Sequence, residues 1–188
     1  MTIAYAPDTC AAPLAINDIM DRLSVRKTFA KGEEIFGQDG TGDLIHYVAR
    51  GAVRTTRLTA DGRRQVGDFY YAGDLIGLGT GAARRFCAEA LTDCVVQTLR
   101  RAALRDLDDP EIDLAFWEAT RRELERAQDH VMVLGRKTAF EKVACFLMDL
   151  ARRHDAGVVD LPMGRQDMAD YLGLTIETVS RMVSQLQG

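Results

Sequence analysis

The stretch Arg165-Gln-Asp-Met-Ala-Asp-Tyr-Leu-Gly-Leu-Thr-Ile-Glu-Thr-Val-Ser-Arg-Met-Val-Ser-Gln-Leu186 predicts two short amphipathic helices joined by a tight turn. Apolar residues recur at helical spacing in both halves and are expected to form one buried face each. They are Met168, Ala169 and Leu172 in the first helix, and Val179, Val183 and Leu186 in the second. Between the helices, Gly173 can adopt the positive φ that a sharp reversal requires. Thr175 suits the N-cap of the second helix, because its hydroxyl can accept from a backbone amide.

Three polar residues of the second helix, Glu177, Ser180 and Arg181, stand on the face opposite the apolar residues. In a helix-turn-helix, the second helix enters the major groove N-terminus first and presents such residues to base edges. Arg181 can donate two hydrogen bonds to O6 and N7 of guanine, Glu177 can accept from the amino group of cytosine, and Ser180 suits several base edges. Because polar residues on an outer helix face are often simply solvated, this interpretation needs support from the rest of the chain.

The composition is that of an ordinary globular protein, with 47% hydrophobic and 28% charged residues among 188. The sequence has no apolar run long enough to cross a membrane and no basic-then-apolar signal peptide. Since the four cysteines (Cys10, Cys87, Cys94 and Cys145) are scattered, we expect no disulfide framework and a cytoplasmic location.

The charge of the chain is unusual for a protein that binds nucleic acid. The net charge is −4, and from residue 136 onward seven Lys or Arg residues balance seven Asp or Glu residues. Attraction to phosphates supplies most non-specific affinity for DNA. We therefore expect weak non-specific binding and reliance on the two-fold arrangement of a dimer.

The first half of the chain is predicted to be β structure. Residues 1–13 have no periodicity and read as a tail, and residues 14–24 read as a short helix. From Val25 to Leu99, turn glycines recur every eleven residues between short strand-like segments, which favours a sandwich or barrel. Asp61-Gly62 predicts a hairpin turn between Val53–Leu58 and Arg64–Phe69.

Helical periodicity replaces the β pattern after Pro110, which suits the first turn of a helix. Over residues 110–135 a stripe at heptad spacing predicts a coiled-coil-like dimer interface, and it consists of Leu114, Trp117, Leu124 and Val131. Arg121 and Gln128 interrupt this stripe. Four further residues are expected to widen its apolar face: Ile112, Ala119, Ala127 and Leu134. Packing of the helix on its own β domain is the alternative. A further helix is expected over residues 138–153, and Gly135 is a hinge candidate.

The segment Glu177-Thr-Val-Ser-Arg181 resembles the recognition helix of the Crp/Fnr superfamily of bacterial transcription regulators. Its Glu, Ser and Arg follow the Fnr/FixK pattern, whereas the Crp branch has an Arg where this chain has Ile176. The β half agrees, because its turn motifs follow in the order seen in cyclic-nucleotide-binding jelly rolls. These motifs are Lys31-Gly-Glu-Glu-Ile-Phe36, Gly51-Ala-Val-Arg54, Asp61-Gly-Arg63 and Gly73-Asp-Leu-Ile-Gly77.

The resemblance covers roughly residues 28–188 and implies an α+β protein with four parts. Residues 1–24 would be the tail and short helix, 25–107 a β jelly-roll sensor or effector domain, 108–135 a dimerisation helix, and 136–188 a helix-turn-helix domain. It further implies a homodimeric regulator, typically an activator, that binds double-stranded DNA at TTGA-type palindromes such as TTGAT-N4-ATCAA and recruits RNA polymerase. Arg165, Thr175 and Thr178 match positions that contact the DNA backbone, where contacts set register rather than sequence.

Sensor chemistry of the superfamily is largely missing from this sequence. A cyclic-AMP sensor has a Glu where this chain has Leu78, and an Arg-Ser pair where it has Arg84-Arg85. An Fnr-type iron–sulfur cluster needs clustered N-terminal thiolates, and this chain has Cys10 alone there. Cys87 and Cys94 are expected to be buried thiols. We therefore expect no cofactor and a FixK-like protein whose activity is set by its abundance.

Two other classes of function compete with a DNA-reading regulator. Haem needs one axial ligand, so His46, His130 and His154 keep a haem-dependent sensor as an alternative. An enzyme is not expected, because the sequence has no paired His ligands, no Gly-rich phosphate loop and no nucleophile elbow.

The position of the last residue bears on DNA affinity. Family members usually continue past the recognition helix into a β-hairpin wing, whereas this sequence ends at Gly188. We therefore expect a domain truncated after the recognition helix, with the underside of Val179 and Val183 exposed. A dimerisation or ligand-binding module with impaired DNA binding is the corresponding alternative.

Overall fold

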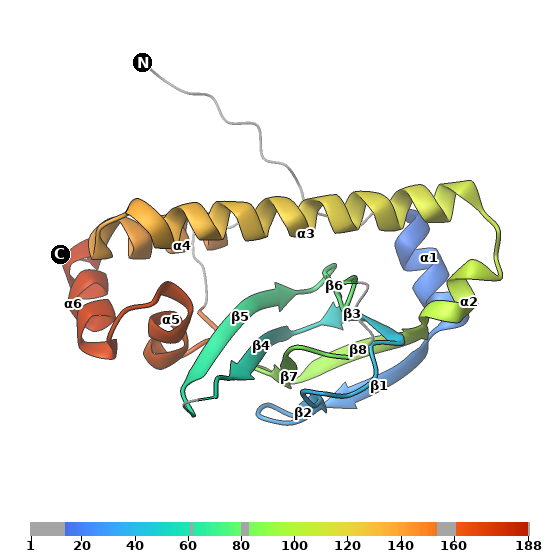
Figure 1. Cartoon of the computed structure of the whole chain (residues 1–188), viewed down its shortest axis with the longest axis horizontal. Helices are drawn as coiled ribbons and strands as arrows, with labels where there is room; N and C mark the ends of the chain where they lie inside the picture. Colours follow the sequence, from blue (N-terminus) through green and yellow to red (C-terminus); the bar gives the residue numbers. More distant parts are fainter. Residues whose placement is uncertain (1–13, 61, 80–82, 154–160, 188) are drawn as a thin grey trace, which may run out of the picture. The chain divides into compact units, whose positions relative to one another are not determined.

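The computed structural model describes residues 14–60, 62–79, 83–153 and 161–187 (Figure 1). The predicted tail, Cys10, Asp61 and His154 lie outside these residues. The chain divides into two compact units, one that ends at residue 128 and one that begins at residue 129, so the boundary falls within a helix. Among the described residues, no helix combines the length and the apolar composition that crossing a membrane requires.

The first unit begins with helix α1 (Leu14–Leu23) and continues into a β-roll of two antiparallel sheets. One sheet has the strand order β1-β8-β3-β6 and the other β2-β7-β4-β5. The strands are β1 (Val25–Phe29), β2 (Glu34–Phe36), β3 (Leu44–Arg50), β4 (Ala52–Leu58), β5 (Arg64–Tyr71), β6 (Leu75–Ile76), β7 (Cys87–Ala90) and β8 (Cys94–Arg100). The predicted jelly roll is confirmed.

The predicted hairpin between β4 and β5 is confirmed by their pairing. Leu58 pairs with Arg64 next to the turn, and Ala52 pairs with Tyr71 at the other end. Gly62 has a φ of 78° in this turn, a conformation that glycine adopts without steric cost. The strand pattern therefore predicted this local pairing, which depends on a short connection.

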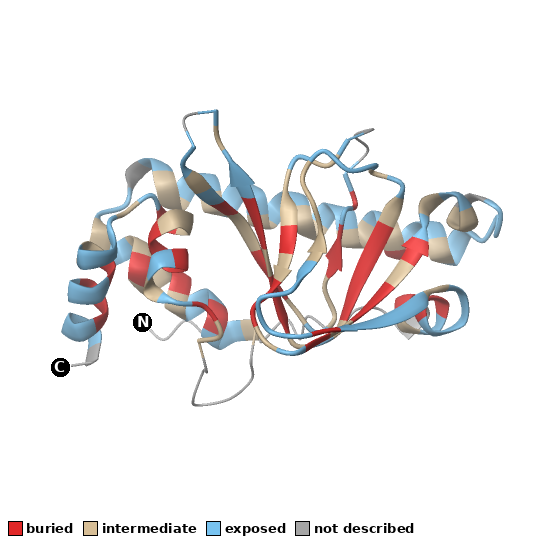
Figure 2. Cartoon of the chain, turned by 90° about the horizontal axis from the view of Figure 1, so that it is seen from below, coloured by how far each residue is buried: buried red, intermediate tan, exposed pale blue. Residues whose placement is uncertain are grey.

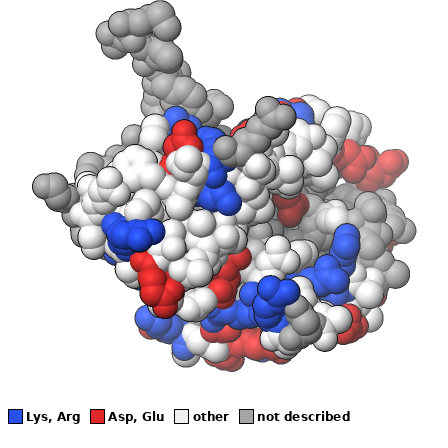
Figure 3. Space-filling model, turned by 60° about the vertical axis from the view of Figure 1, so that its left-hand side comes forward, with Lys and Arg blue, Asp and Glu red and all other residues white. Residues whose placement is uncertain are grey.

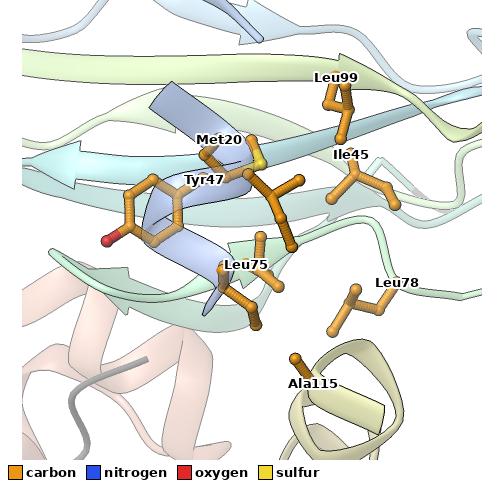
Figure 4. Packing of buried hydrophobic residues seen from close by; sticks show 9 residues of the cluster. Met20, Ile45, Tyr47, Leu75, Leu78, Leu99 and Ala115 are labelled. Atoms are coloured by element: carbon orange, nitrogen blue, oxygen red, sulfur yellow. The ribbon is translucent and has the colours of Figure 1, made fainter. Parts of the chain in front are cut away.

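The central strands β3 and β8 of the sheet β1-β8-β3-β6 have buried residues on both faces. Successive strand residues point to opposite faces, so Val48 of β3 and Val96 of β8 enter the core between the sheets, while Ile45 and Leu99 point the other way. There they join a second core, which is covered by α1 and by the helix that contains Ala115 (Figure 4). Its other buried members are Ile16, Ile19, Met20, Tyr47, Leu75, Leu78 and Ala115.

Helix α3 (Pro110–Arg136) follows the short helix α2 (Arg101–Arg105) and has two different faces. Ile112 and Ala119 pack against the second core, on the side of buried Ala115. The predicted stripe stays exposed: the exposed fraction is 58% for Leu114, Trp117 and Leu124, and 65% for Val131.

The expectation that Ile112 and Ala119 widen this stripe was wrong. At 3.6 residues per turn, Ile112 lies about 160° around the helix from Leu114, and Ala119 lies as far from Trp117. The two sets of apolar residues therefore serve opposite faces, one toward the β-roll and one toward solvent.

The second unit contains the end of α3 and three further helices, α4 (Ala139–Arg153), α5 (Arg165–Leu172) and α6 (Ile176–Gln187). All were predicted within a few residues. Buried Val143, Phe146 and Leu150 lie on one face of α4, as expected from their spacing. The α+β fold class is thus confirmed.

Candidate nucleic-acid interface

The helices of the second unit are held by caps and by a shared apolar core (Figure 2). Thr138 caps α4, since Glu141 N–H donates to its hydroxyl at 3.3 Å and Thr138 N–H donates to the Glu141 carboxylate at 2.8 Å. The Thr138 N–H and the Thr138 hydroxyl both donate to the Glu141 carboxylate at 2.8 Å, and they lower the pKa of Glu141. At the end of α3, the His130 ring stacks on Tyr171 of α5 with 3.9 Å between centroids. Burial, then nearby Lys142, lowers the pKa of His130.

The turn between α5 and α6 has the predicted chemistry. Gly173 adopts the left-handed conformation, with φ 63° and ψ 42°, and its N–H donates to the carbonyl of Ala169. Leu174 N–H also donates to that carbonyl, at 3.0 Å. Thr175 caps α6, because its hydroxyl accepts from Thr178 N–H at 3.3 Å. Each bond satisfies a backbone group that a helix end leaves unpaired.

The buried face of α6 differs from the prediction at its end. Val179 and Val183 are buried, with exposed fractions of 0% and 5%, and so is Met182. Leu186 was expected beside them but is 41% exposed, because it lies in the last turn. The expectation that Val179 and Val183 would be uncovered was also wrong, since α4 and α5 pack on α6.

The three predicted base-reading residues lie together on the opposite face of α6, which we call the reading face. Glu177, Ser180 and Arg181 are all exposed there. Hydrogen bonds from its own backbone amide and from Thr175 lower the pKa of Glu177. Glu177 is therefore an ionised acceptor near neutral pH, while Arg181 is a donor, so the reading face carries both polarities.

Of the predicted backbone-contacting residues, Thr175 and Thr178 adjoin the reading face at the start of α6. Thr175 is exposed, and half-buried Thr178 places its hydroxyl 3.0 Å from that of Thr175. Half-buried Arg165 begins α5, with Nη1 3.5 Å from Met168 Sδ. Ser184 was not predicted, but it is exposed and extends the reading face by one turn. Its spacing of seven residues from Glu177 could have identified it.

Residues of the β-roll with the chemistry to serve a sensor are engaged with one another. The guanidinium of Arg84 lies over the Phe36 ring at 3.9 Å, and its Nη2 lies 2.9 Å from His46 Nε2. Because arginine only donates, His46 Nε2 accepts, and Nδ1 donates to Thr98 Oγ1 at 3.0 Å. Burial and the Arg84 charge lower the pKa of His46 to about 3. Both ring nitrogens of His46 are thus occupied.

Three further residues of the roll that the sequence singled out have structural roles. Leu78 stands where a cyclic-AMP sensor has a Glu, and it packs in the second core near Ala115 (Figure 4). Cys94 is buried, as expected, and donates to the carbonyl of Ala52 at 3.1 Å. Cys87 is half-buried and lies 2.9 Å from Thr56 Oγ1.

Charge on the surface is mixed rather than one-sided. Figure 3 shows Lys and Arg side chains interspersed with Asp and Glu over the visible face. This agrees with the near balance of charge in the sequence. Such a surface offers no broad excess of positive charge for a general attraction to phosphates.

Known proteins match both halves of the chain. Residues 26–109 match the cyclic nucleotide-binding domain, and residues 161–188 match the bacterial regulatory proteins of the crp family. The nitrogen fixation regulation protein FixK of Azorhizobium caulinodans is 43% identical over 195 residues, covering 100% of this chain and 77% of that protein. The chain belongs to the Crp/Fnr family. It is a DNA-binding transcription regulator rather than an enzyme.

Other members of the Crp/Fnr family support a FixK-like placement. The structure of FixK2 from Bradyrhizobium japonicum superposes with a TM-score of 0.82 at 44% identity, covering 88% of this chain and 85% of that one. The transcriptional activatory protein AadR of Rhodopseudomonas palustris is 38% identical over 180 residues, covering 92% of this chain and 75% of that protein.

Proposed function

We propose that this Crp/Fnr protein acts as a homodimer that reads TTGA-type palindromes and activates transcription. The observation that carries the proposal is the reading face on a capped helix-turn-helix. Arg181 would donate to O6 and N7 of the guanine, Glu177 would accept from the amino group of the paired cytosine, and Ser180 would contact a thymine. Arg165, Thr175 and Thr178 would contact phosphates and set the register.

Dimerisation is supported by the exposed stripe of α3, which we call the apolar stripe: Leu114, Trp117, Leu124 and Val131. Exposure of large apolar side chains to water is unfavourable, and their burial against a second helix in a coiled coil stabilises the dimer. A two-fold dimer would present two reading faces, which matches the symmetry of a palindrome.

The remaining roles follow from the proposed domain organisation. Residues 25–107 would be the effector domain, residues 108–135 the dimerisation helix, and residues 136–188 the DNA-binding domain. RNA polymerase would be the partner of the DNA-bound dimer, and the cytoplasm its location. No cofactor is assigned to the roll. The engagement of His46 by Arg84 and Thr98 argues against His46 as a haem ligand.

Fluorescence anisotropy tests the proposed reading directly. The chain is titrated into a labelled TTGAT-N4-ATCAA duplex, a scrambled duplex of equal composition, and a palindrome whose spacer is one base pair longer. We expect specific binding at least about 10³-fold tighter than scrambled, and loss of most of that preference with the longer spacer. Equal affinity for the three duplexes would contradict the proposal.

A further inference from the structure

The face of α3 that packs on the β-roll changes from apolar to charged along the helix. Ile112, Ala115 and Ala119 pack against the second core. One turn and two turns further on, the same face carries Glu123 and Arg126. Apolar residues at these two positions could also have packed on the roll. The charged side chains there therefore point to a role other than apolar packing.

Four side chains meet at this point, Tyr70, Asp74, Glu123 and Arg126, and we call them the polar clamp. Arg126 Nη1 donates to Asp74 Oδ1 at 3.0 Å, with side-chain exposures of 23% and 12%. The Tyr70 hydroxyl donates to Glu123 Oε1 at 3.3 Å, and the Arg126 guanidinium lies 5.8 Å from the centre of the Tyr70 ring. The clamp joins α3 to the end of β5 and to the turn that follows it.

Asp74 is itself held firmly by the backbone of that turn. Its Oδ2 accepts from Tyr71 N–H at 2.9 Å, and its own N–H donates to the Tyr71 carbonyl at 2.9 Å. Gly73, with φ 98°, donates to the carbonyl of Val48 on β3. The carboxylate that receives Arg126 therefore has a fixed position on the roll.

Burial and neighbouring charges act in opposite directions on the charged residues of the clamp. Burial raises the pKa of Glu123, against the opposing effect of Arg126. Burial opposes the charge of Arg126 as well, but Asp74 and Asp68 outweigh it and raise the pKa of Arg126. Replacing a buried ion pair by well-packed apolar residues is often neutral or stabilising. Apolar packing could therefore supply similar stability, whereas a hydrogen-bonded ion pair also selects one geometry.

We propose that the polar clamp positions the dimerisation helix, fixing its rotation and register on the roll so that the apolar stripe faces a second copy. This inference rests on the proposed dimer. Apolar contacts tolerate sliding, whereas the Arg126–Asp74 pair and the Tyr70–Glu123 hydrogen bond are satisfied in one register. Leu124 lies between the two clamp residues in sequence but stays 58% exposed. A rotation by one residue, about 100°, would turn part of the stripe toward the helix's own roll.

The test compares dimerisation with folding in the full chain. The double variant Asp74→Asn/Arg126→Met removes the ion pair while the Asn side-chain oxygen can still accept from Tyr71 N–H, and Arg122→Ala is the control on the same helix. We expect the double variant to keep its thermal unfolding midpoint while its dimer dissociation constant, from sedimentation velocity, rises at least about tenfold. The control should change neither. An unchanged dissociation constant in the folded double variant would overturn the positioning role.

A charge exchange provides an independent readout if removal of the ion pair disturbs folding. Arg126→Asp should weaken dimerisation, and adding Asp74→Arg should recover a large part of the loss. Failure of the exchange to recover any affinity would also overturn the role. A wild-type chain that stays monomeric would contradict the dimer and the clamp together, whereas a dimeric wild type with unaffected variants contradicts the clamp alone.

Discussion

Gly173 shows how one residue sets the geometry of the interface. Its φ of 63° lies in the left-handed region, and an added Cβ would have ordinary contact, 3.9 Å, with Leu134. Gly173→Ala should therefore destabilise the second unit by about 1–2 kcal/mol through backbone strain rather than a clash. Gly135→Ala is the matched control, because Gly135 lies in α3 with open space around its Cβ position. That change should stabilise by up to about 1 kcal/mol. Urea unfolding of both variants measures the sign of each change in the free energy of unfolding. Equal changes would contradict the predicted backbone strain at position 173.

His46 predicts a specific sensitivity to acid. Its pKa of about 3 in the folded chain lies below the ordinary 6.5. Between these two values, His46 is protonated in the unfolded chain and neutral in the folded chain. Stability is therefore fully present above pH 6.5 and is lost as the pH falls toward 3, by at most about 1.4 kcal/mol per pH unit. His46→Gln can still accept from Arg84 and donate to Thr98. As the pH falls from 6.5 to 4, the free energy of unfolding of this variant should rise relative to that of the wild type. A difference in stability that does not change with pH would contradict a buried neutral imidazole at His46.

At the residue level, the sequence was most informative where a residue type has one structural use. Gly173 and Thr175 were predictable because a left-handed turn and an N-cap demand those residues. The arrangement of His46, Arg84 and Phe36 was not predictable, since these residues come from segments that meet only after the sheets have formed. Leu186 was misplaced because helical spacing gives the face of a residue but not whether a partner reaches the last turn.

Helix α3 is the element on which the proposed assembly depends. Leu124 of the apolar stripe and Met148 of α4 are both exposed apolar residues, at 58% and 54%. If the apolar stripe forms the dimer interface, Leu124→Asn removes one apolar side chain from each protomer's side of that interface. The dissociation constant of the dimer should then rise at least about tenfold. Met148→Asn should leave it unchanged. Equal effects on sedimentation would show that the stripe has no special role.

Elements defined by local pattern were predicted well, and their packing was not. The helix over residues 110–135 and the β4–β5 hairpin follow from periodicity and a short turn. The sheet order β1-β8-β3-β6 joins strands far apart in sequence, which spacing alone does not determine. For the same reason, the division of α3 into a roll-facing side and an exposed side required the positions of the strands.

The charge balance of the whole molecule leads to a prediction about salt. The 24 Lys and Arg residues are outnumbered by 28 Asp and Glu residues, so the chain has no excess of cations to place on phosphates. Arg165→Ala should weaken binding to specific and scrambled DNA alike, and should reduce the slope of log affinity against log salt by about 0.9 for each phosphate that is no longer neutralised. Titrations at three salt concentrations measure this slope. A weakening confined to specific DNA would instead place Arg165 on a base.

A double-mutant cycle between Arg181 and its guanine tests the proposed reading most directly. Wild type and Arg181→Ala are titrated against the TTGA palindrome with either guanine or 7-deazaguanine, which lacks the N7 acceptor but pairs normally. We predict that 7-deazaguanine weakens wild-type binding by about 1 kcal/mol or more per half-site and leaves Arg181→Ala unaffected. Additive losses of affinity in the cycle would contradict the assignment of Arg181 to the guanine.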